Sequence, residues 1–547
     1  MSRSNLKVNP RYRRTKIFPM SLFGKQSADL QIFRSFGKTP AEQLWLVLLS
    51  LAGVLLHLLF YSNLGFHRDE LLYLSLGEHP DFGYFSVPPL IGILALIVVK
   101  IFGYSLFAVK LVPALAGGAM VYLATLTAKE LQGSLFSQLL AGTGLICSIL
   151  FLRTFSLFQP VFLDVFFWTV SFYLLVRYIN TNHRTSLFYL GVAIGFGFLN
   201  KYNILFLVLA VLVVLPFTRY RKLFISKELY VAVFIAFLMV LPNLIWQIMH
   251  QLPVLDHLDE LRDSQLSRMS SATFLTDQLL MIFPATLLAL PGVCCLLFSR
   301  RLEKFRLIGY TMLVVLVLYL LLQGKSYYSA GIYPVMIAAG AVCCERYLRS
   351  NVLRWLFILL LLLLTGAMLP MGVSSKPPDK MVAYFDKVAK MTGSDAVRRF
   401  EDNKYHSLPQ DYADMLGWEE LTSVTNKAWL EVKQKEQCLI YAENYGQAGA
   451  ITILGKQYNL PEAISFSDNF RYWTPRKLDR EITSLIYIND EPGEDIRQLF
   501  GNIREVGSIT DPLAREFGTK VFLCTQPQSS FNRLWDGKMQ ALLQRKN

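Results

Sequence analysis

The sequence predicts a mainly α-helical, multi-pass membrane protein with a small soluble α/β domain at its C-terminal end. Two observations support this fold class. Of the 547 residues, 53% are hydrophobic and only 17% are charged, whereas soluble chains carry about 25% charge. Long apolar runs also follow one another between residues 44 and 371. An ordinary cytosolic protein is therefore excluded, and so is a disordered chain, because 13% of the residues are aromatic.

The net charge of +14 is distributed unevenly along the chain. Residues 372–547 hold 23 Lys and Arg against 24 Asp and Glu, so residues 1–371 hold 31 basic and 16 acidic residues. Positive charge between apolar runs is typical of the cytoplasmic loops of membrane proteins. The sequence therefore predicts contact with membrane lipids and gives no reason to expect nucleic acid as a partner.

Twelve apolar runs come close to the length of about 20 residues that a membrane-spanning helix needs. They are Leu44–Tyr61, Pro88–Phe102, Phe107–Ala128, Phe136–Leu152, Val161–Tyr178, Leu187–Leu199, Ile204–Phe217, Leu229–Ile248, Phe274–Phe298, Leu307–Leu322, Gly331–Cys344 and Leu353–Met371. If the basic clusters between them are all cytoplasmic, an even number of crossings must separate each pair. Three runs separate the basic N-terminal tail from Lys129, so one of the three does not cross.

The run Pro88–Phe102 is short and opens with two prolines, and we expect it to lie along the outer membrane face. About 11 transmembrane helices and one periplasm-facing interfacial helix remain. The predicted organisation is a basic cytoplasmic tail over 1–42, a transmembrane domain over 43–371 and a periplasmic α/β domain over 372–547. In this last part β-rich runs, expected as strands over 438–442, 463–466, 485–488 and 521–524, alternate with helical patterns. A disulfide between Cys438 and Cys524 is left open.

An acidic pair, Asp69-Glu70, follows the first apolar run directly after His67-Arg68. Acids against the outer leaflet suit a general base that activates a hydroxyl, or a divalent cation site. A solvated polar loop is the alternative. Farther along, Asp164 is embedded in an apolar stretch and needs a partner there, either a bound cation or Arg68. An acid that reaches the membrane surface is the alternative for Asp164.

Three lysines, Lys100, Lys201 and Lys325, stand at the predicted outer ends of apolar runs, where positive charge is unexpected. An ammonium group just below the membrane surface can hold a lipid phosphate or pyrophosphate, although each lysine alone could be an interfacial anchor. Acids that activate an acceptor, beside cations that stabilise a leaving phosphate, indicate group transfer. The outer face offers no nucleotide sugar, and no Walker A motif is present, so the donor is expected to be linked to a lipid.

At these residues the sequence resembles the GT-C glycosyltransferases of family 39, which include protein O-mannosyltransferases and bacterial aminoarabinose transferases. The segments that carry the resemblance are Arg68-Asp69-Glu70, Tyr84 with Pro88-Pro89-Leu90, Phe102-Gly103 with 111–117, Phe158-Gln159-Pro160 with Asp164 and Trp168, Leu199-Asn200-Lys201-Tyr202, Gly324-Lys325 with Tyr327 and Tyr333-Pro334, 408–418 and 443–450. The resemblance implies a GT-C transmembrane catalytic domain. It also implies inverting transfer from a polyprenyl-phosphate sugar.

The resemblance further implies roles for single residues. Asp69, with Glu70, corresponds to the catalytic base, and Asp164 to an acid that orients the acceptor or coordinates a metal. Donor phosphate binding falls to Lys100, Lys201 and Lys325. Further donor or acceptor contacts are expected at Arg68, Tyr84, Gln159, Tyr327 and Tyr328.

A divalent metal is left open, and no other cofactor is expected. Some relatives hold a metal with an acid before the phosphate-binding lysine and a histidine in a later outer loop. Here Val99 precedes Lys100, while His257 lies in such a loop.

The sequence thus predicts a glycosyltransferase of the bacterial inner membrane that moves a sugar from undecaprenyl phosphate to an envelope acceptor, which could be lipid A, a glycan or a protein. Its active site would face the periplasm. The alternative is a transporter or flippase for a lipid or anionic solute that uses the same charges, although no internal repeat supports it. A structural or sensory protein would leave the charged residues unexplained. The sugar, the acceptor and the oligomeric state are not determined.

Overall fold

The apolar runs all fold into helices in the computed structural model, which describes residues 39–264 and 270–544. Two runs are divided, 136–152 into α5 and α6, and 274–298 into α12 and α13. The helices of these runs are α1 (Pro40–Leu58), α3 (Leu90–Phe102), α4 (Leu106–Glu130), α5 (Leu135–Ile146), α6 (Ile149–Thr154), α7 (Pro160–Thr181), α8 (Arg184–Asn200), α9 (Ile204–Val214), α10 (Lys227–Met249), α12 (Ser271–Leu280), α13 (Thr286–Phe298), α14 (Arg306–Leu321), α15 (Tyr333–Tyr347) and α16 (Asn351–Gly372).

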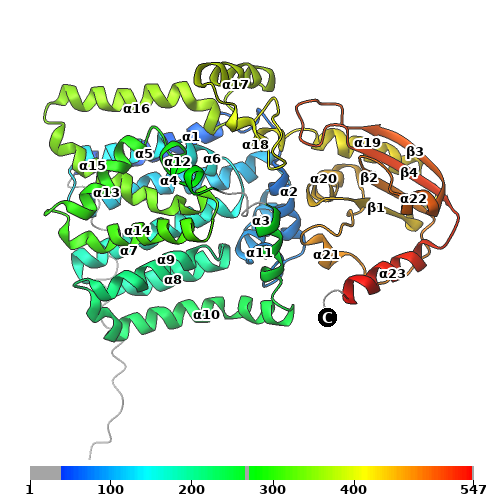
Figure 1. Cartoon of the computed structure of the whole chain (residues 1–547), viewed down its shortest axis with the longest axis horizontal. Coiled ribbons are helices and arrows are strands. Elements are labelled where there is room, and N and C mark those ends of the chain that lie inside the picture. Colours follow the sequence, from blue (N-terminus) through cyan, green and yellow to red (C-terminus); the bar gives the residue numbers. More distant parts are fainter. Residues whose placement is uncertain (1–38, 265–269, 545–547) are drawn as a thin grey trace, which may run out of the picture. The chain divides into compact units, whose positions relative to one another are not determined.

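Within the described residues, seven helices are long and apolar enough to cross a membrane, and four shorter apolar helices accompany them. The seven are α1, α4, α7, α10, α14, α15 and α16. They lie side by side in the part of Figure 1 coloured blue to green, where α8 packs between α7 and α10, and α15 between α5 and α13. Helices α10 and α16 leave most of their apolar side chains uncovered, as lipid-facing helices do. The mainly helical, multi-pass fold class is confirmed, and the total of 11 crossings stays a prediction.

Two loop helices connect this bundle to the rest of the chain. Helix α2 (Arg68–Glu78) packs against α3 and against α20 (Tyr445–Leu454) of the C-terminal part. Helix α3 has 13 residues and so spans about 20 Å, which is shorter than the hydrocarbon core of a bilayer. Helices α9 and α13 are no longer than α3 although their runs are predicted to cross, so the interfacial position of Pro88–Phe102 stays a prediction. Residues 46–547 form one compact unit, so the bundle and the C-terminal sheet can be described together.

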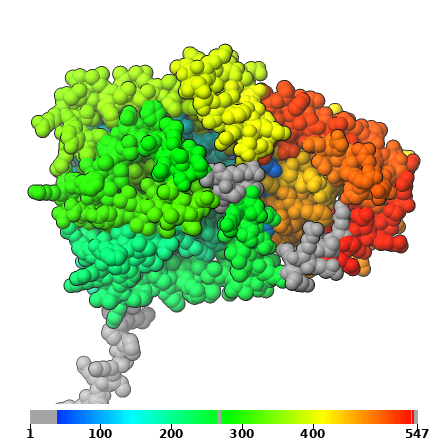
Figure 2. All heavy atoms as spheres, in the orientation of Figure 1, coloured from blue at the N-terminus to red at the C-terminus, as the bar shows by residue number. Residues whose placement is uncertain are grey.

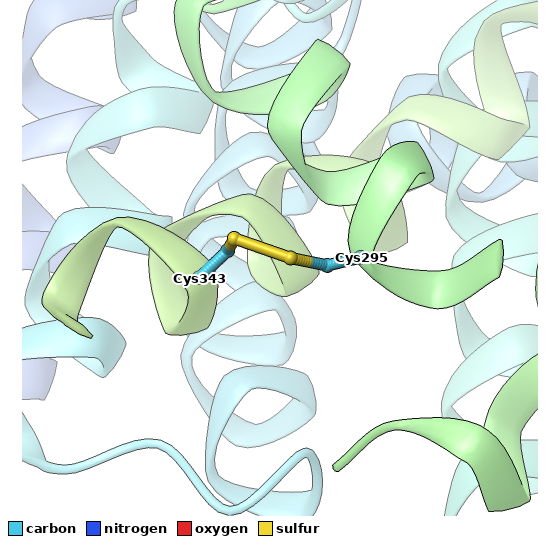
Figure 3. Close-up of a disulfide and its surroundings, with 2 residues drawn as sticks. All are labelled: Cys295 and Cys343. Carbon is cyan, nitrogen blue, oxygen red and sulfur yellow. A yellow bond between two sulfur atoms is a disulfide. The ribbon is translucent and has the colours of Figure 1, made fainter. Parts of the chain in front are cut away.

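The closest helix contact in the bundle joins α13 to α15. A Cβ atom at Gly292 would lie 1.9 Å from the Met336 carbonyl oxygen, and one at Gly340 would lie 1.8 Å from that of Leu288. Only glycine allows two backbones to approach so closely. A disulfide between Cys295 and Cys343 crosses the same contact, as Figure 3 shows.

The C-terminal part contains a four-stranded mixed sheet of β1 (Cys438–Ala442), β2 (Ser484–Asn489), β3 (Phe500–Ser508) and β4 (Lys520–Pro527), in the order β1-β2-β4-β3. Strands β1 and β2 are parallel, and β4 runs antiparallel to both β2 and β3. The expected strand over 463–466 is reduced to one bridge between Tyr441 and Ile464, and β3 was not anticipated. Cys438 and Cys524 are both free, so the disulfide left open between them does not form.

Helices cover both faces of this sheet. On one face α19 (Trp418–Glu431) and α20 pack with Ile440, Ile486 and Leu523. On the other, α22 (Glu494–Leu499) and α23 (Phe531–Gln544) pack with Leu485 and Phe522. Helix α17 (Pro378–Thr392) and the residues after it, yellow in Figure 2, lie between the end of α16 and the orange and red sheet domain. The three other short helices are α11 (Pro253–Ser264), α18 (Gln410–Ala413) and α21 (Phe470–Trp473).

Candidate functional site

One large cavity, of about 600 Å³, lies where the bundle, α2 and the C-terminal domain meet. We call it the main cavity. Eight of the residues expected in the site line it, and they come from α2, α11, the start of α7 and the segments before α9 and α15. The eight are Arg68, Asp69, Gln159, Lys201, His257, Lys325, Tyr327 and Tyr328. The fold thus collects residues that are separated by up to 260 positions in the sequence.

The N-terminus of α2 determines the positions of the two acids. The His67 ring nitrogen Nδ1 accepts a hydrogen bond from the Asp69 backbone N–H at 3.1 Å, and Glu70 accepts one from the His67 backbone N–H at 2.8 Å. This reciprocal capping box fixes the first turn. Successive helical residues point about 100° apart, so the turn aims Asp69 into the main cavity and Glu70 away from it.

Glu70 is fully buried and does not line the main cavity. Its carboxylate accepts hydrogen bonds from Lys110 Nζ at 2.7 and 2.8 Å and from the Phe158 backbone N–H at 2.8 Å, in addition to the capping bond. All of its acceptor capacity is used inside the fold. Glu70 thus occupies a structural position, with Lys110, inside α4, as its buried counter-charge, and its geometry does not support the expected catalytic role.

Asp69 presents its carboxylate to the main cavity and holds two hydrogen bonds. Tyr445 donates its hydroxyl to Oδ1 at 2.9 Å, and Gln159 donates Nε2 to Oδ2 at 3.2 Å. Burial raises the pKa of the Asp69 carboxyl above its ordinary value, and the charge of Arg68 and the Tyr445 hydrogen bond act against that shift. A half-buried carboxylate with a raised pKa and a fixed orientation has the properties of a general base.

Arg68 lies over the ring of Tyr445, with its guanidinium carbon 4.2 Å from the ring centroid. Gly446, which follows Tyr445, leaves room for this contact, because a Cβ atom there would lie 2.6 Å from Arg68 Cγ. Gly449 brings the same helix, α20, against Leu71. The C-terminal domain is thus a direct part of the site. The expected pairing of Arg68 with Asp164 does not occur among the contacts of the described residues.

Two cations face the main cavity from the bundle side. Lys201 Nζ lies 4.5 Å from the ring centroid of Tyr328 and 5.2 Å from that of Tyr327, while Lys325 Nζ lies 6.0 Å from the Tyr327 ring. Lys325 also stands 3.9 Å from Glu401. Both ammonium groups thus lie against the same ring, that of Tyr327. A pair of like charges of this kind favours an anionic ligand between them.

Asp164 is buried and does not line the main cavity. Its Oδ2 accepts a hydrogen bond from Asn203 Nδ2 at 2.7 Å, and the same amide donates to the Tyr328 carbonyl at 3.0 Å. The positive charge that acts on this carboxylate is that of Lys201. The structure therefore gives Asp164 a partner that the sequence did not indicate, and a place where it can orient Lys201 and Tyr328.

Two expected site residues lie elsewhere. Lys100 is exposed on the last turn of α3 and does not line the main cavity. Tyr84 is buried, and its hydroxyl donates to the Leu76 and His79 carbonyls at 3.0 and 3.2 Å, which closes the loop after α2. The geometry thus makes Tyr84 a structural residue and leaves Lys100 apart from the other two lysines.

Many residues that line the main cavity were not predicted as site residues from the sequence, and they include Arg153, Asp411, Asp414, Tyr445 and Arg515. Arg153 is ion-paired with Asp411, and Arg515 with Asp414 at 3.1 Å. Arg153 could have been noticed, because it follows an apolar run on the expected outer side. The other four lie in the C-terminal part, whose approach to α2 no sequence pattern indicates.

The described residues contain one trio that could hold a metal ion, formed by His67, Asp411 and Asp414. Its donor chemistry does not fit. Because His67 Nδ1 accepts the Asp69 N–H, the neutral ring carries its proton on Nε2, the atom that faces the two carboxylates at 3.9 and 4.0 Å. Burial and nearby Arg and Lys charges lower the His67 pKa, and they would also repel a cation. His257 belongs to no such trio; its ring meets Phe85 edge-on at 5.5 Å.

Comparison with known proteins identifies the fold. Residues 86–246 match the family model described as dolichyl-phosphate-mannose-protein mannosyltransferase. The crystal structure of ArnT from Cupriavidus metallidurans bound to undecaprenyl phosphate superposes with a TM-score of 0.59 at 13% identity, covering 88% of this chain and 98% of that one. The apo structure of the same enzyme gives the same values. The chain therefore has the ArnT fold, which confirms the GT-C type expected from the sequence.

The lipid A galacturonosyltransferase RgtD of Rhizobium johnstonii is 26% identical over 216 residues. That alignment covers 37% of this chain and 43% of RgtD, so the chain spans less than half the length of this relative.

Proposed function

We propose that the protein is a membrane glycosyltransferase that moves one sugar from a polyprenyl-phosphate donor, such as undecaprenyl phosphate, to a hydroxyl or phosphate of an envelope acceptor. The observation that carries this proposal is the main cavity, which is lined by the carboxylate of Asp69 and by the ammonium groups of Lys201 and Lys325. The similarity to a lipid A glycosyltransferase and to an enzyme crystallised with undecaprenyl phosphate supports the same reaction class. No finding favours the transporter alternative.

In the proposed reaction the acceptor oxygen attacks the anomeric carbon of the donor from the side opposite the phosphate. Asp69 takes the acceptor proton as the new C–O bond forms. The bond between the anomeric carbon and the phosphate oxygen breaks, and that oxygen leaves with the electron pair. Lys201 and Lys325 stabilise the charge that develops on the phosphate. Because the acceptor attacks from the side opposite the phosphate, the anomeric centre is inverted.

The other predicted residues take supporting roles in this proposal. Gln159, Arg68 and Tyr445 hold Asp69 in position, while Asp164 and Tyr328 position Lys201. Tyr327 lies between the two lysines, where its hydroxyl can reach a phosphate or a sugar. Lys100 remains a candidate for contact with the lipid carrier near the membrane surface. The periplasmic orientation and the boundaries at residues 42 and 371 belong to the proposal as well.

The test uses purified protein in lipid nanodiscs and cells that lack the gene. We expect mass spectrometry of envelope glycolipids and glycoproteins to show one glycoform that depends on the gene. Asp69→Asn should reduce formation of this glycoform by about 10²–10⁴-fold. The same variant should bind undecaprenyl phosphate that carries no sugar as wild type does. Lys201→Met should weaken that binding. Asp479→Asn, an exposed acid outside the main cavity, is the control. Full activity of Asp69→Asn would overturn the assignment of the base.

A further inference from the structure

A second cavity, of about 230 Å³, lies inside the C-terminal domain, on the face of the sheet that α22 and α23 cover. We call it the aromatic cavity. Tyr441 and Tyr487 are partners in the parallel register of β1 and β2, and their rings stack with centroids 5.7 Å apart and planes inclined by 7°. Phe466 stacks on Trp535 with centroids 5.4 Å apart. Two pairs of stacked rings therefore line one small space.

The aromatic cavity reaches the carboxyl end of β1, where β1 and β2 diverge. Strands β1 and β2 are parallel neighbours, but the chain leaves them in opposite directions. After β1 it enters α20, which packs on one face, and after β2 it enters α22, which packs on the other. Such a divergence opens a crevice beyond the carboxyl ends of the two strands.

The mouth of this cavity is acidic. Glu443, directly after β1, and Asp495, in α22, both line it and are exposed. The Tyr487 hydroxyl contacts Glu443 Oε2 at 3.5 Å and accepts a hydrogen bond from Asn489 at 3.0 Å. A ligand that suits these walls has an apolar face for the rings and hydroxyl or ammonium donors for the carboxylates. A pyranose ring has both, and its size suits a cavity below the range of drug-sized pockets.

The two cavities are lined by the same two segments of chain. Glu443 lines the aromatic cavity, and Tyr445, two residues later, lines the main cavity and holds Asp69. Phe466 lines the aromatic cavity, and the next two residues, Ser467 and Asp468, line the main cavity. The two cavities therefore share these two segments of chain, with the aromatic cavity on the face of the sheet that α22 and α23 cover.

We infer that the aromatic cavity is a carbohydrate subsite that binds one neutral or amino pyranose of the acceptor, next to the position that receives the new sugar. This inference rests on the proposed function, because it assigns the acceptor a sugar component. Uronic acids are disfavoured because Glu443 and Asp495 would repel their carboxylates.

Saturation-transfer NMR on the full-length protein in nanodiscs tests the inference, with N-acetylglucosamine, glucosamine and glucuronic acid as probes. Wild-type protein should bind the first two in preference to the third. Tyr441→Leu, which keeps an apolar side chain at a half-buried position, should weaken that binding about fivefold to tenfold. Tyr458→Leu, at an exposed tyrosine outside both cavities, should bind as wild type does.

The same variants separate the subsite from the transferase proposal. Asp69→Asn should lose transfer but keep binding of the amino sugar, and Tyr441→Leu should raise KM for the acceptor more than it lowers kcat. Retained binding of undecaprenyl phosphate shows that Tyr441→Leu is folded. Equal binding by wild type and Tyr441→Leu, a preference for glucuronic acid, or no binding of any probe would overturn the subsite, whatever the outcome for transfer.

Discussion

Asp69 acquires its chemistry from neighbours that are distant in the sequence. The capping box around His67 and Glu70 is local and fixes the direction of the carboxylate. The two hydrogen bonds to that carboxylate come from Gln159 and Tyr445, which are 90 and 376 positions away. The Asp69-Glu70 pair looked like two equivalent acids in the sequence, yet the fold buries Glu70 and presents Asp69 to the main cavity.

The hydrogen bond from Tyr445 predicts a shift in the pH dependence of transfer. It stabilises the ionised form of Asp69 and lowers a pKa that burial raises. A base must be deprotonated, so activity falls as the pH falls through this pKa. Tyr445→Phe should therefore move the acid limb of kcat/KM upward by about one pH unit, since a hydrogen bond to a charged group contributes about 1.5 kcal/mol. Tyr405→Phe, at an exposed position, should leave the limb in place.

Asp414 predicts a pH-dependent stability. Burial raises the pKa of its carboxyl to about 6, against the opposing charges of Arg515 and Arg68. The folded protein thus binds a proton that the unfolded chain releases near pH 4, and this stabilisation is present below about pH 4 and lost as the pH rises through about 6. The Tm of wild type minus that of Asp414→Asn should therefore be larger at pH 5 than at pH 7. Equal differences at the two pH values would contradict the raised pKa.

At the scale of elements, the helices were easier to predict than the strands. Each apolar run in the bundle became a helix, because a backbone in lipid must satisfy its hydrogen bonds within the segment. Strand β3 was missed because residues 500–508 contain Gly501 and Gly507 and expose Asn502 and Arg504, as an edge strand can. The run 463–466 has the residue types of a strand but forms only one bridge, between Ile464 and Tyr441 on the edge of β1 that does not face β2.

The contact between α13 and α15 predicts a strong effect of one methyl group. Gly340→Ala would place Cβ 1.8 Å from the backbone oxygen of Leu288, and the helices would have to separate. Overpacking costs about 1–3 kcal/mol when side chains can yield, and a backbone atom yields less. We expect a lower Tm and a smaller monodisperse fraction in size-exclusion chromatography.

Gly366→Ala is the matched control, because a Cβ there meets nothing within 4 Å. An unchanged Tm for Gly340→Ala would show that α13 and α15 are not packed as described.

At the scale of the whole molecule, the distribution of charge predicts the orientation. The main cavity and the C-terminal domain should lie on the outer side, and the basic loops between α9 and α10 on the inner side. Alkaline phosphatase fused after Gly393 should be active in cells, because this enzyme folds only outside the cytoplasm, and the same enzyme fused after Lys222 should be inactive. The reverse pattern would contradict both the orientation and the proposed periplasmic reaction.

The sequence by itself determined the membrane class, the apolar helices and four charged residues of the main cavity, Arg68, Asp69, Lys201 and Lys325, because charge is costly in or near lipid and so stands out against apolar runs. It also indicated the GT-C type through ordered motifs. Only the tertiary structure showed that Asp69 lines the main cavity while Glu70 is buried. It also showed that Asp164 is buried outside the main cavity and that Lys100 does not line it. Tertiary contact alone brought Tyr445 and the aromatic cavity to the site, because the approach of α20 to α2 depends on packing between segments almost 380 residues apart.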